Sequence, residues 1–208
     1  MKSLLCSWGG AVNTPFIFES QFDAKWKKMR VAYVPNAKDF MNGSEKSKSL
    51  KEVVQRFEAQ HKSVEIFDLY DRQSNFTVDF MTNKFDMIYV GGGMLGPLHR
   101  AVFETGFNEL LNQLGSTDMY YVGSSAGAMI CSETLQVAGW YPDEQEPDIA
   151  TKTGLGWLPY EIFPHYQNNL KGSIKNNSAH PMIIMEDGSA VSIEGKELRF
   201  HNQARILI

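Results

Sequence analysis

Short apolar runs alternate with segments of helical periodicity over the first two thirds of the chain, which is typical of a parallel sheet flanked by helices. The expected strands are residues 3–7, 30–35, 63–69, 87–90 and 119–123. Four more strand-like runs close the chain, at residues 182–185, 190–193, 198–201 and 204–207. Gly188 and Gly195 mark the turns between the first three of these runs. The pattern predicts an α/β fold with a mostly parallel, flavodoxin-like three-layer sheet and C-terminal antiparallel strands, in one domain spanning residues 1–208.

One of the helical segments has a clear amphipathic pattern. Its apolar positions recur at i, i+3, i+4 and i+7, namely Leu50, Val53, Val54 and Phe57. The other face carries charged side chains, namely Lys48, Lys51, Glu52 and Arg56. Ser44 is the expected N-cap of this helix.

Residues 139–160 have a different character, with Gly, Pro, Trp and a cluster of Asp and Glu. We expect a long surface excursion there, and such loops often shape a substrate site.

Composition and charge argue against a nucleic-acid-binding, membrane or disulfide-rich secreted protein. The 208 residues carry a net charge of −4, with 24 acidic and 20 basic side chains dispersed along the chain, so no basic patch for nucleic acid or anionic membrane is expected. The N-terminus lacks the apolar stretch of a secretory signal and no run is long enough to span a membrane, which favours a cytoplasmic location. Cys6 and Cys131 lie far apart without metal-type spacing, so we expect buried, reduced thiols and neither a disulfide nor a metal site.

The first candidate for chemistry is Ser125, in the segment MYYVGSSAGAMI at residues 119–130. A strand that stops at a G-x-S-x-G turn and restarts as a helix is the context of a nucleophile elbow, in which a serine is exposed on a sharp turn. The alternative is a coincidental turn rich in small residues.

A second glycine-rich turn, Gly91-Gly92-Gly93, follows the preceding strand. Its unhindered backbone N–H groups could donate to an oxyanion. Gly91, Gly93 and Gly96 also fit the dinucleotide pattern G-x-G-x-x-G, but the next strand ends without the required carboxylate and Pro97 lies in the turn. A purely structural turn is the remaining alternative, and no cofactor is expected.

A serine nucleophile needs a base, and the chain has five histidines. His61 ends a charged helix, His99 lies on the helix after the glycine turn, and His180 and His201 flank terminal strands. His165 follows an apolar run and Pro164, beyond the long loop, and is the candidate base. The alternative is a packing residue among aromatic neighbours.

The third member of a triad would be a carboxylate that orients the imidazole. Glu186 and Asp187 end a strand, and because neighbours on an extended chain face opposite ways, only one should point at His165. Both could instead be turn residues of a hairpin.

The combined motifs resemble a known family. Residues 88–132, with Phe163-Pro164-His165-Tyr166, residues 29–36 and residues 184–191, are similar to the peptidase E family of serine peptidases, which includes aspartyl dipeptidase and cyanophycinase. The resemblance implies a fold like that of class I glutamine amidotransferases and a Ser-His-Glu triad.

Carried onto this chain, the resemblance implies Ser125 as nucleophile and His165 as base. It also implies an oxyanion hole from Gly93, with Gly92, and the N–H of Ala126. The family's glutamate aligns with Asp187, which makes the triad Ser-His-Asp, with Glu186 as the alternative acid.

Two departures from the family bear on the substrate. Met94-Leu95 stands where family members often have Asn-Thr. The aspartyl dipeptidases carry an arginine after Pro-His-Phe, whereas residues 167–180 here contain none, and Lys171 or Lys175 would be a poor replacement for a bidentate guanidinium. A preference for N-terminal aspartate is therefore left open.

The sequence thus predicts a serine peptidase that cuts short peptides, including dipeptides, without metal or cofactor. The alternatives are an amidase or amidotransferase-like hydrolase on a non-peptide amide, and a catalytically silent binding module. The apolar terminal strands could pair inside one sheet or at the edge of a homodimer.

Overall fold

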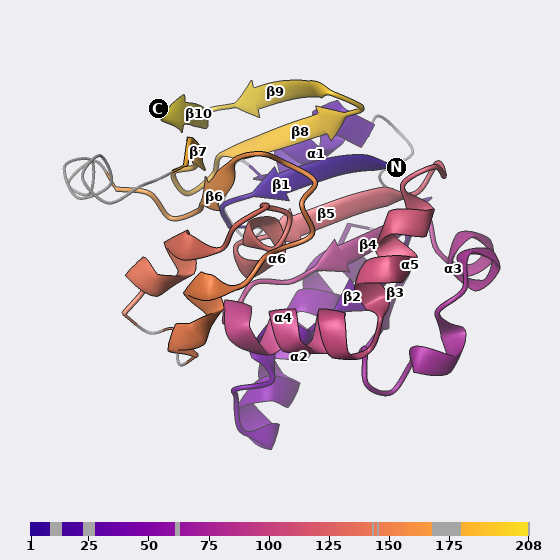
Figure 1. The fold of residues 1–208 in the computed structure, drawn as a ribbon. Coiled ribbons are helices and arrows are strands. Elements are labelled where there is room, and N and C mark those ends of the chain that lie inside the picture. Colours follow the sequence, from indigo (N-terminus) through magenta and orange to yellow (C-terminus); the bar gives the residue numbers. More distant parts are fainter. Residues whose placement is uncertain are drawn as a thin grey trace.

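The computed structural model describes residues 1–8, 14–22, 28–60, 63–142, 144, 146–167 and 180–207. Its centre is a seven-stranded sheet in the order β3-β2-β4-β5-β1-β8-β9 (Figure 1). The first five of these strands run parallel, as the sequence predicts. They are β3 (Ser63–Ile66), β2 (Arg30–Val34), β4 (Met87–Val90), β5 (Tyr120–Ser124) and β1 (Lys2–Cys6). Every residue of β4 is buried, as expected for a central strand covered on both faces.

The C-terminal strands partly follow the prediction. β8 (Ala190–Glu194) and β9 (Glu197–His201) extend the sheet as an antiparallel hairpin, whose turn contains Gly195 at φ 61°. In contrast, β7 (Met182–Ile184) lies in a separate sheet between β6 (Glu161–Phe163) and β10 (Arg205–Leu207), parallel to β6 and antiparallel to β10.

The turn predicted at Gly188 is present, with φ 86°, but it connects two sheets, so the alternative in which Glu186 and Asp187 belong to a hairpin turn is wrong. Local turn chemistry allows the chain to reverse, but the partner of each strand depends on contacts distant in sequence. The terminal strands pair within the chain, and a homodimer remains a prediction.

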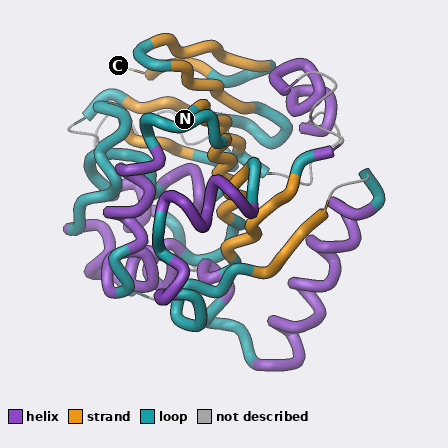
Figure 2. The backbone as a smooth tube through the Cα atoms, turned by 90° about the vertical axis from the view of Figure 1, so that its right-hand side faces the viewer, coloured by secondary structure: helices purple, strands orange, loops and turns teal. Residues whose placement is uncertain are grey.

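Helices cover both faces of the main sheet, as the edge-on view shows (Figure 2). On one side, α1 (Thr14–Phe22) and α2 (Gly43–Glu58) contribute Ile17, Phe22 and Phe57 to one buried cluster. On the other side, a larger cluster is formed with α3 (Val78–Lys84), α4 (Leu95–Glu104), α5 (Phe107–Leu114) and α6 (Ala126–Met129). This is the predicted α/β architecture.

The start of α2 corrects one sequence prediction. Asn42 is the N-cap, and its side-chain oxygen accepts a hydrogen bond from the N–H of Glu45 at 3.0 Å. Ser44 lies inside the helix and donates to the Asn42 side chain. Both residue types cap helices well, so the sequence did not distinguish between them.

The 139–160 segment is more than a surface excursion. The 3₁₀ helix η4 (Gln136–Trp140) leads into it and η5 (Pro147–Thr151) lies within it, and Ile149 and Leu158 are buried in the larger cluster. Two further 3₁₀ helices lie elsewhere in the chain: η2 (Asn36–Lys38) follows β2, and η3 (Gln73–Asn75) follows β3.

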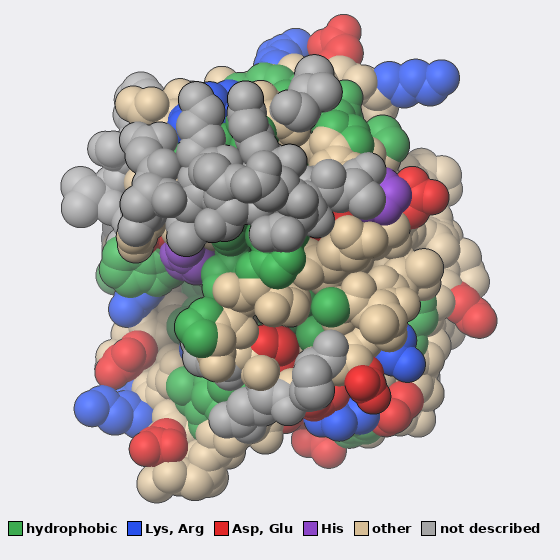
Figure 3. Space-filling model, turned by 60° about the vertical axis from the view of Figure 1, so that its left-hand side comes forward, with side chains coloured by type: hydrophobic (Ala, Val, Ile, Leu, Met, Phe, Trp, Pro, Cys, Tyr) green, Lys and Arg blue, Asp and Glu red, His purple; other side chains and the backbone are tan. Residues whose placement is uncertain are grey.

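Charged side chains of both signs are interspersed over the face shown in Figure 3. Within the described ranges, none of the helices has the length and apolar character needed to cross a membrane.

Candidate active site

The segment around Ser125 forms a strand, a tight turn and a helix. β5 ends at Ser124, α6 begins at Ala126, and Ser125 between them has φ 51° and ψ −110°, a conformation that non-glycine residues rarely adopt. A Cβ atom on Gly123 would overlap the carbonyl of Gly127, and one on Gly127 would overlap the carbonyl of Val90. The two glycines of the motif are therefore required by close backbone approach.

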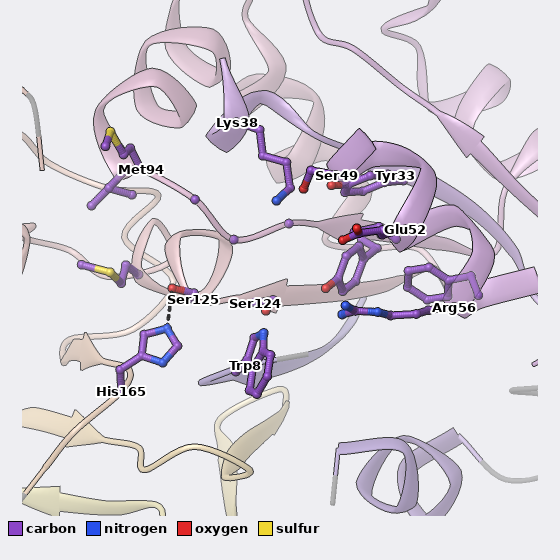
Figure 4. Close-up of a pocket in the computed structure, with 18 of the residues that line it drawn as sticks. Trp8, Tyr33, Lys38, Ser49, Glu52, Arg56, Met94, Ser124, Ser125 and His165 are labelled. Carbon is purple, nitrogen blue, oxygen red and sulfur yellow. Dashed lines mark hydrogen bonds between the residues drawn. The ribbon is translucent and has the colours of Figure 1, made fainter. Parts of the chain in front are cut away.

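The side chains of Ser125, His165 and Asp187 lie in a row. The Oγ of Ser125 is 3.0 Å from Nε2 of His165, as the dashed line in Figure 4 marks. On the other side of the ring, Nδ1 of His165 is 2.6 Å from Oδ1 of Asp187. The structure thus brings together three residues that lie 40 and 22 positions apart in the chain.

The neighbouring carboxylate points elsewhere. Glu186 accepts a hydrogen bond from Nη1 of Arg205 at 3.2 Å. Of the two carboxylates, Asp187 hydrogen-bonds the imidazole and Glu186 pairs with Arg205, so one of them meets His165, as the sequence predicts.

Ser7 is a member of this cluster that the sequence did not reveal. It follows β1, is fully buried, and its Oγ accepts a hydrogen bond from the backbone N–H of His165 at 2.7 Å. The same hydroxyl donates to Oδ1 of Asp187 at 3.1 Å. The only available signal was its position at the carboxyl end of a central strand, where sites form in such sheets.

The glycine loop after β4 lies against Ser125. A Cβ atom on Gly92 would come within 3.1 Å of the Ser125 Cβ. Gly93 has φ 152°, and a Cβ there would overlap the carbonyl of Ala37, so only glycine fits.

Some backbone N–H groups around Ser125 are hydrogen-bonded within the protein, and others are not. The N–H of Gly91 donates to Val34 O and that of Met94 to Ala37 O. In the part of the chain that the structure describes, the N–H groups of Gly92, Gly93 and Ala126 have no protein acceptor. Three unused N–H donors near one serine hydroxyl can stabilise an oxyanion by donating hydrogen bonds to it.

The dinucleotide alternative finds no support at this loop. Helix α4 begins at Leu95, and its first N–H donates to a carboxylate oxygen of Glu144 at 2.9 Å. A protein carboxylate therefore occupies the helix N-terminus where a pyrophosphate would bind.

Two of the other histidines, His99 and His201, are engaged away from Ser125. His99 stacks on Phe103 and hydrogen-bonds the carbonyl of Thr153, and burial lowers its pKa below the usual 6.5. His201 hydrogen-bonds Ser192, and burial and then the charge of Arg199 lower its pKa. His61, Lys171 and Lys175 lie outside the described residues.

A cavity of about 440 Å³ opens in front of Ser125 and His165. The 139–160 segment contributes Tyr141 and Glu144 to its lining, as the prediction for that loop implied. Its lining also includes side chains that sequence reasoning did not assign to a site, namely Trp8, Tyr33, Lys38, Ser49, Glu52 and Arg56 (Figure 4). Among the described residues, no group of three or more His, Cys, Asp or Glu could hold a metal ion.

A serine on a strained strand-to-helix turn, followed by an imidazole and a carboxylate on an α/β fold, is the arrangement that serine hydrolases use. The sequence profile of peptidase family S51 matches residues 11–201. The chain therefore belongs to peptidase family S51.

Individual relatives carry related names. The chain is 27% identical over 124 residues to a peptidase E of Streptomyces coelicolor, which covers 53% of this chain and 49% of that protein. It is 33% identical over 86 residues to an uncharacterised peptidase of Pasteurella multocida, covering 41% of this chain and 42% of that protein. The matched part thus spans about half or less of these two relatives. A peptidase E of Actinobacillus pleuropneumoniae is 22% identical over 191 residues, covering 86% of this chain and 77% of that protein.

A solved structure supports the fold. A candidate peptidase E protein from Listeria monocytogenes EGD-e superposes with a TM-score of 0.74 at 21% identity, covering 96% of this chain and 97% of that one. The predicted family and α/β fold are confirmed.

Proposed function

We propose that this chain is a serine peptidase that hydrolyses short peptides. The observation that carries the proposal is the continuous contact from Ser125 Oγ through His165 to Asp187, at 3.0 and 2.6 Å. Nε2 of His165 takes the hydroxyl proton as Ser125 Oγ bonds to the substrate carbonyl carbon, and the π electrons move to the carbonyl oxygen. His165 then returns the proton to the leaving amine as the C–N bond breaks, and water hydrolyses the acyl-enzyme.

The unused N–H groups of Gly92, Gly93 and Ala126 would stabilise the oxyanion of each tetrahedral intermediate. Loss of one such donor typically lowers kcat by about 10²- to 10³-fold. Asp187 would hold the imidazole with Nδ1 protonated, so that Nε2 is free to accept the serine proton. Ser7 would position both His165 and Asp187 through its two hydrogen bonds.

The size of the cavity supports a small substrate. A volume of about 440 Å³ lies at the lower end of the range for pockets that enclose small ligands. Short peptides therefore fit better than an extended polypeptide.

A fluorophosphonate probe tests the proposal, because it reacts only with an activated serine. Wild-type protein is expected to be labelled at Ser125, whereas Ser125→Ala and His165→Ala are expected to remain unlabelled while keeping a wild-type circular dichroism spectrum. Unlabelled, well-folded wild type would contradict catalysis and favour a silent binding module. Hydrolysis of non-peptide amides without hydrolysis of dipeptides would favour the amidase alternative.

The same assay separates the two carboxylates. Asp187→Asn is expected to lower the labelling rate by up to about 10⁴-fold, since an amide favours the wrong imidazole tautomer. Glu186→Gln should stay within a few-fold of wild type, because its contact is with Arg205. The reverse result would reject Asp187 as the third residue.

A further inference from the structure

Two cationic side chains point into the cavity opposite Ser125. Lys38 is the last residue of η2, which follows β2, and Arg56 lies near the end of α2. Both line the same cavity as Ser125, and their charged groups enter it from different elements (Figure 4). In the part of the chain that the structure describes, neither side chain forms an ion pair or hydrogen bond with another residue.

The environment of Lys38 disfavours its charge. Burial lowers the pKa of its ammonium, the positive charge of Arg56 lowers it further, and Glu52 opposes these effects. Two like charges that share a partly desolvated cavity raise its free energy, and a bound anion would relieve that cost.

The carboxylates of the cavity leave this positive charge available. Glu144 is occupied, since it accepts hydrogen bonds from the backbone N–H groups of Leu95 and Glu146. Glu52 precedes Arg56 by one helical turn on α2, yet no ion pair joins the two. Tyr33 also lines this cavity. Its buried hydroxyl has no hydrogen-bond partner among the described residues.

We propose that Lys38 and Arg56 form an anion subsite that binds a carboxylate of the substrate in the cavity that Ser125 also lines. The inference rests on the proposed peptidase function and names the substrate class for the same site. Arg56 can engage both carboxylate oxygens, whereas Lys38 contributes a point charge. The carboxylate belongs either to the chain end of a short peptide or to an acidic side chain.

Four probe peptides distinguish the sources. Ala-Ala and Ala-Ala amide differ only in the terminal carboxylate, and Asp-Ala amide and Asn-Ala amide differ only in the side-chain carboxylate. Hydrolysis by wild type is compared with Lys38→Met, Arg56→Met and a control, Lys51→Met, whose exposed side chain on α2 does not line the cavity.

Lys38→Met and Arg56→Met are each expected to lower kcat/KM by about 10- to 100-fold for the carboxylate-bearing peptide of one pair. A loss of this size is expected when one charge-assisted hydrogen bond is removed. The uncharged member and the Lys51→Met enzyme should change by less than about 2-fold. The pair that responds identifies the source of the carboxylate. Equal losses on both members of each pair, or no loss on any, would overturn the subsite.

Binding to Ser125→Ala keeps this test separate from the proposed function. In that background, calorimetry should show a Kd for the preferred carboxylate peptide about 10-fold lower than for its uncharged partner, and the addition of Arg56→Met should abolish the difference. Discrimination in binding without fluorophosphonate labelling of wild type would reject the peptidase function alone. Labelling of wild type without discrimination in binding would reject the anion subsite alone.

Discussion

At the scale of single residues, the strained backbone of the site is supported by one buried hydroxyl. His165 has φ 55°, a left-handed conformation that is costly for a non-glycine residue, and its N–H is satisfied by Ser7 Oγ. The same Oγ orients the Asp187 carboxylate. Ser7 therefore couples the position of the imidazole to the position of its acidic partner.

Ser7→Ala is expected to lower kcat by at least about 10-fold with little change in KM, because it removes an orienting hydrogen bond. It should also destabilise the fold by about 1–3 kcal/mol, since the His165 N–H is left without its acceptor. Steady-state kinetics and urea denaturation measure the two effects. Ser3→Ala, on the same strand, is the control; a loss of stability in Ser7→Ala with unchanged kcat would make Ser7 purely structural.

At the scale of elements, the start of α2 matters to the site because this helix carries Ser49, Glu52 and Arg56 along one wall of the cavity. The spacing of these residues is i, i+3 and i+7, so they form one stripe beside the apolar one. The helical periodicity of the sequence placed Glu52 and Arg56 on the charged face of the helix, away from its apolar stripe. The structure shows that this face borders the cavity.

Asn42→Ala is expected to lower the free energy of unfolding by about 0.5–2 kcal/mol, because the N–H of Glu45 loses its capping acceptor. Ser44→Ala, two residues along the same helix start, should cost less than about 0.5 kcal/mol. Chemical denaturation of the two variants side by side measures the difference. A larger loss in Ser44→Ala would restore Ser44 as the cap.

At the scale of the whole molecule, the reactivity of the two cysteines measures how well the core beneath the site excludes solvent. Cys6 ends β1 and Cys131 follows α6, and both are fully buried, which confirms the apolar setting expected for the two side chains. Burial raises the pKa of each thiol to about 12. The reactive thiolate is therefore present at only roughly one part in ten thousand at pH 8.

Native protein is accordingly expected to resist thiol labelling at pH 8, with both cysteines reacting only as the molecule unfolds. Mass spectrometry measures this on protein pulsed with iodoacetamide in the presence and absence of about 6 M guanidinium chloride, a concentration above the roughly 5 M midpoint at which folds begin to count as hyperstable. Rapid labelling of Cys131 in native protein would reveal local opening beneath the Ser125 turn.

The residues of the candidate site differed in how far the sequence alone could identify them. Ser125 was predictable because Gly123 and Gly127 are required by backbone contacts within a few residues and with one adjacent strand. His165 and Asp187 were candidates from their neighbours, but their meeting depends on β6 and β7 pairing in a second sheet. Ser7, Lys38 and Arg56 have no specific local signal, because a hydroxyl at the end of a strand or a cation on a helix has many uses.

The sequence by itself determined the α/β class, the parallel core strands and the Ser125 turn, since alternating periodicity and close backbone approach are local in their causes. It also determined the family, through motifs spread along the chain. Only the tertiary structure decided that Gly188 joins two sheets, that Asp187 rather than Glu186 contacts His165, and which cations face the cavity. These outcomes depend on long-range strand pairing, which brings together side chains from distant segments and leaves no periodic trace in any one of them.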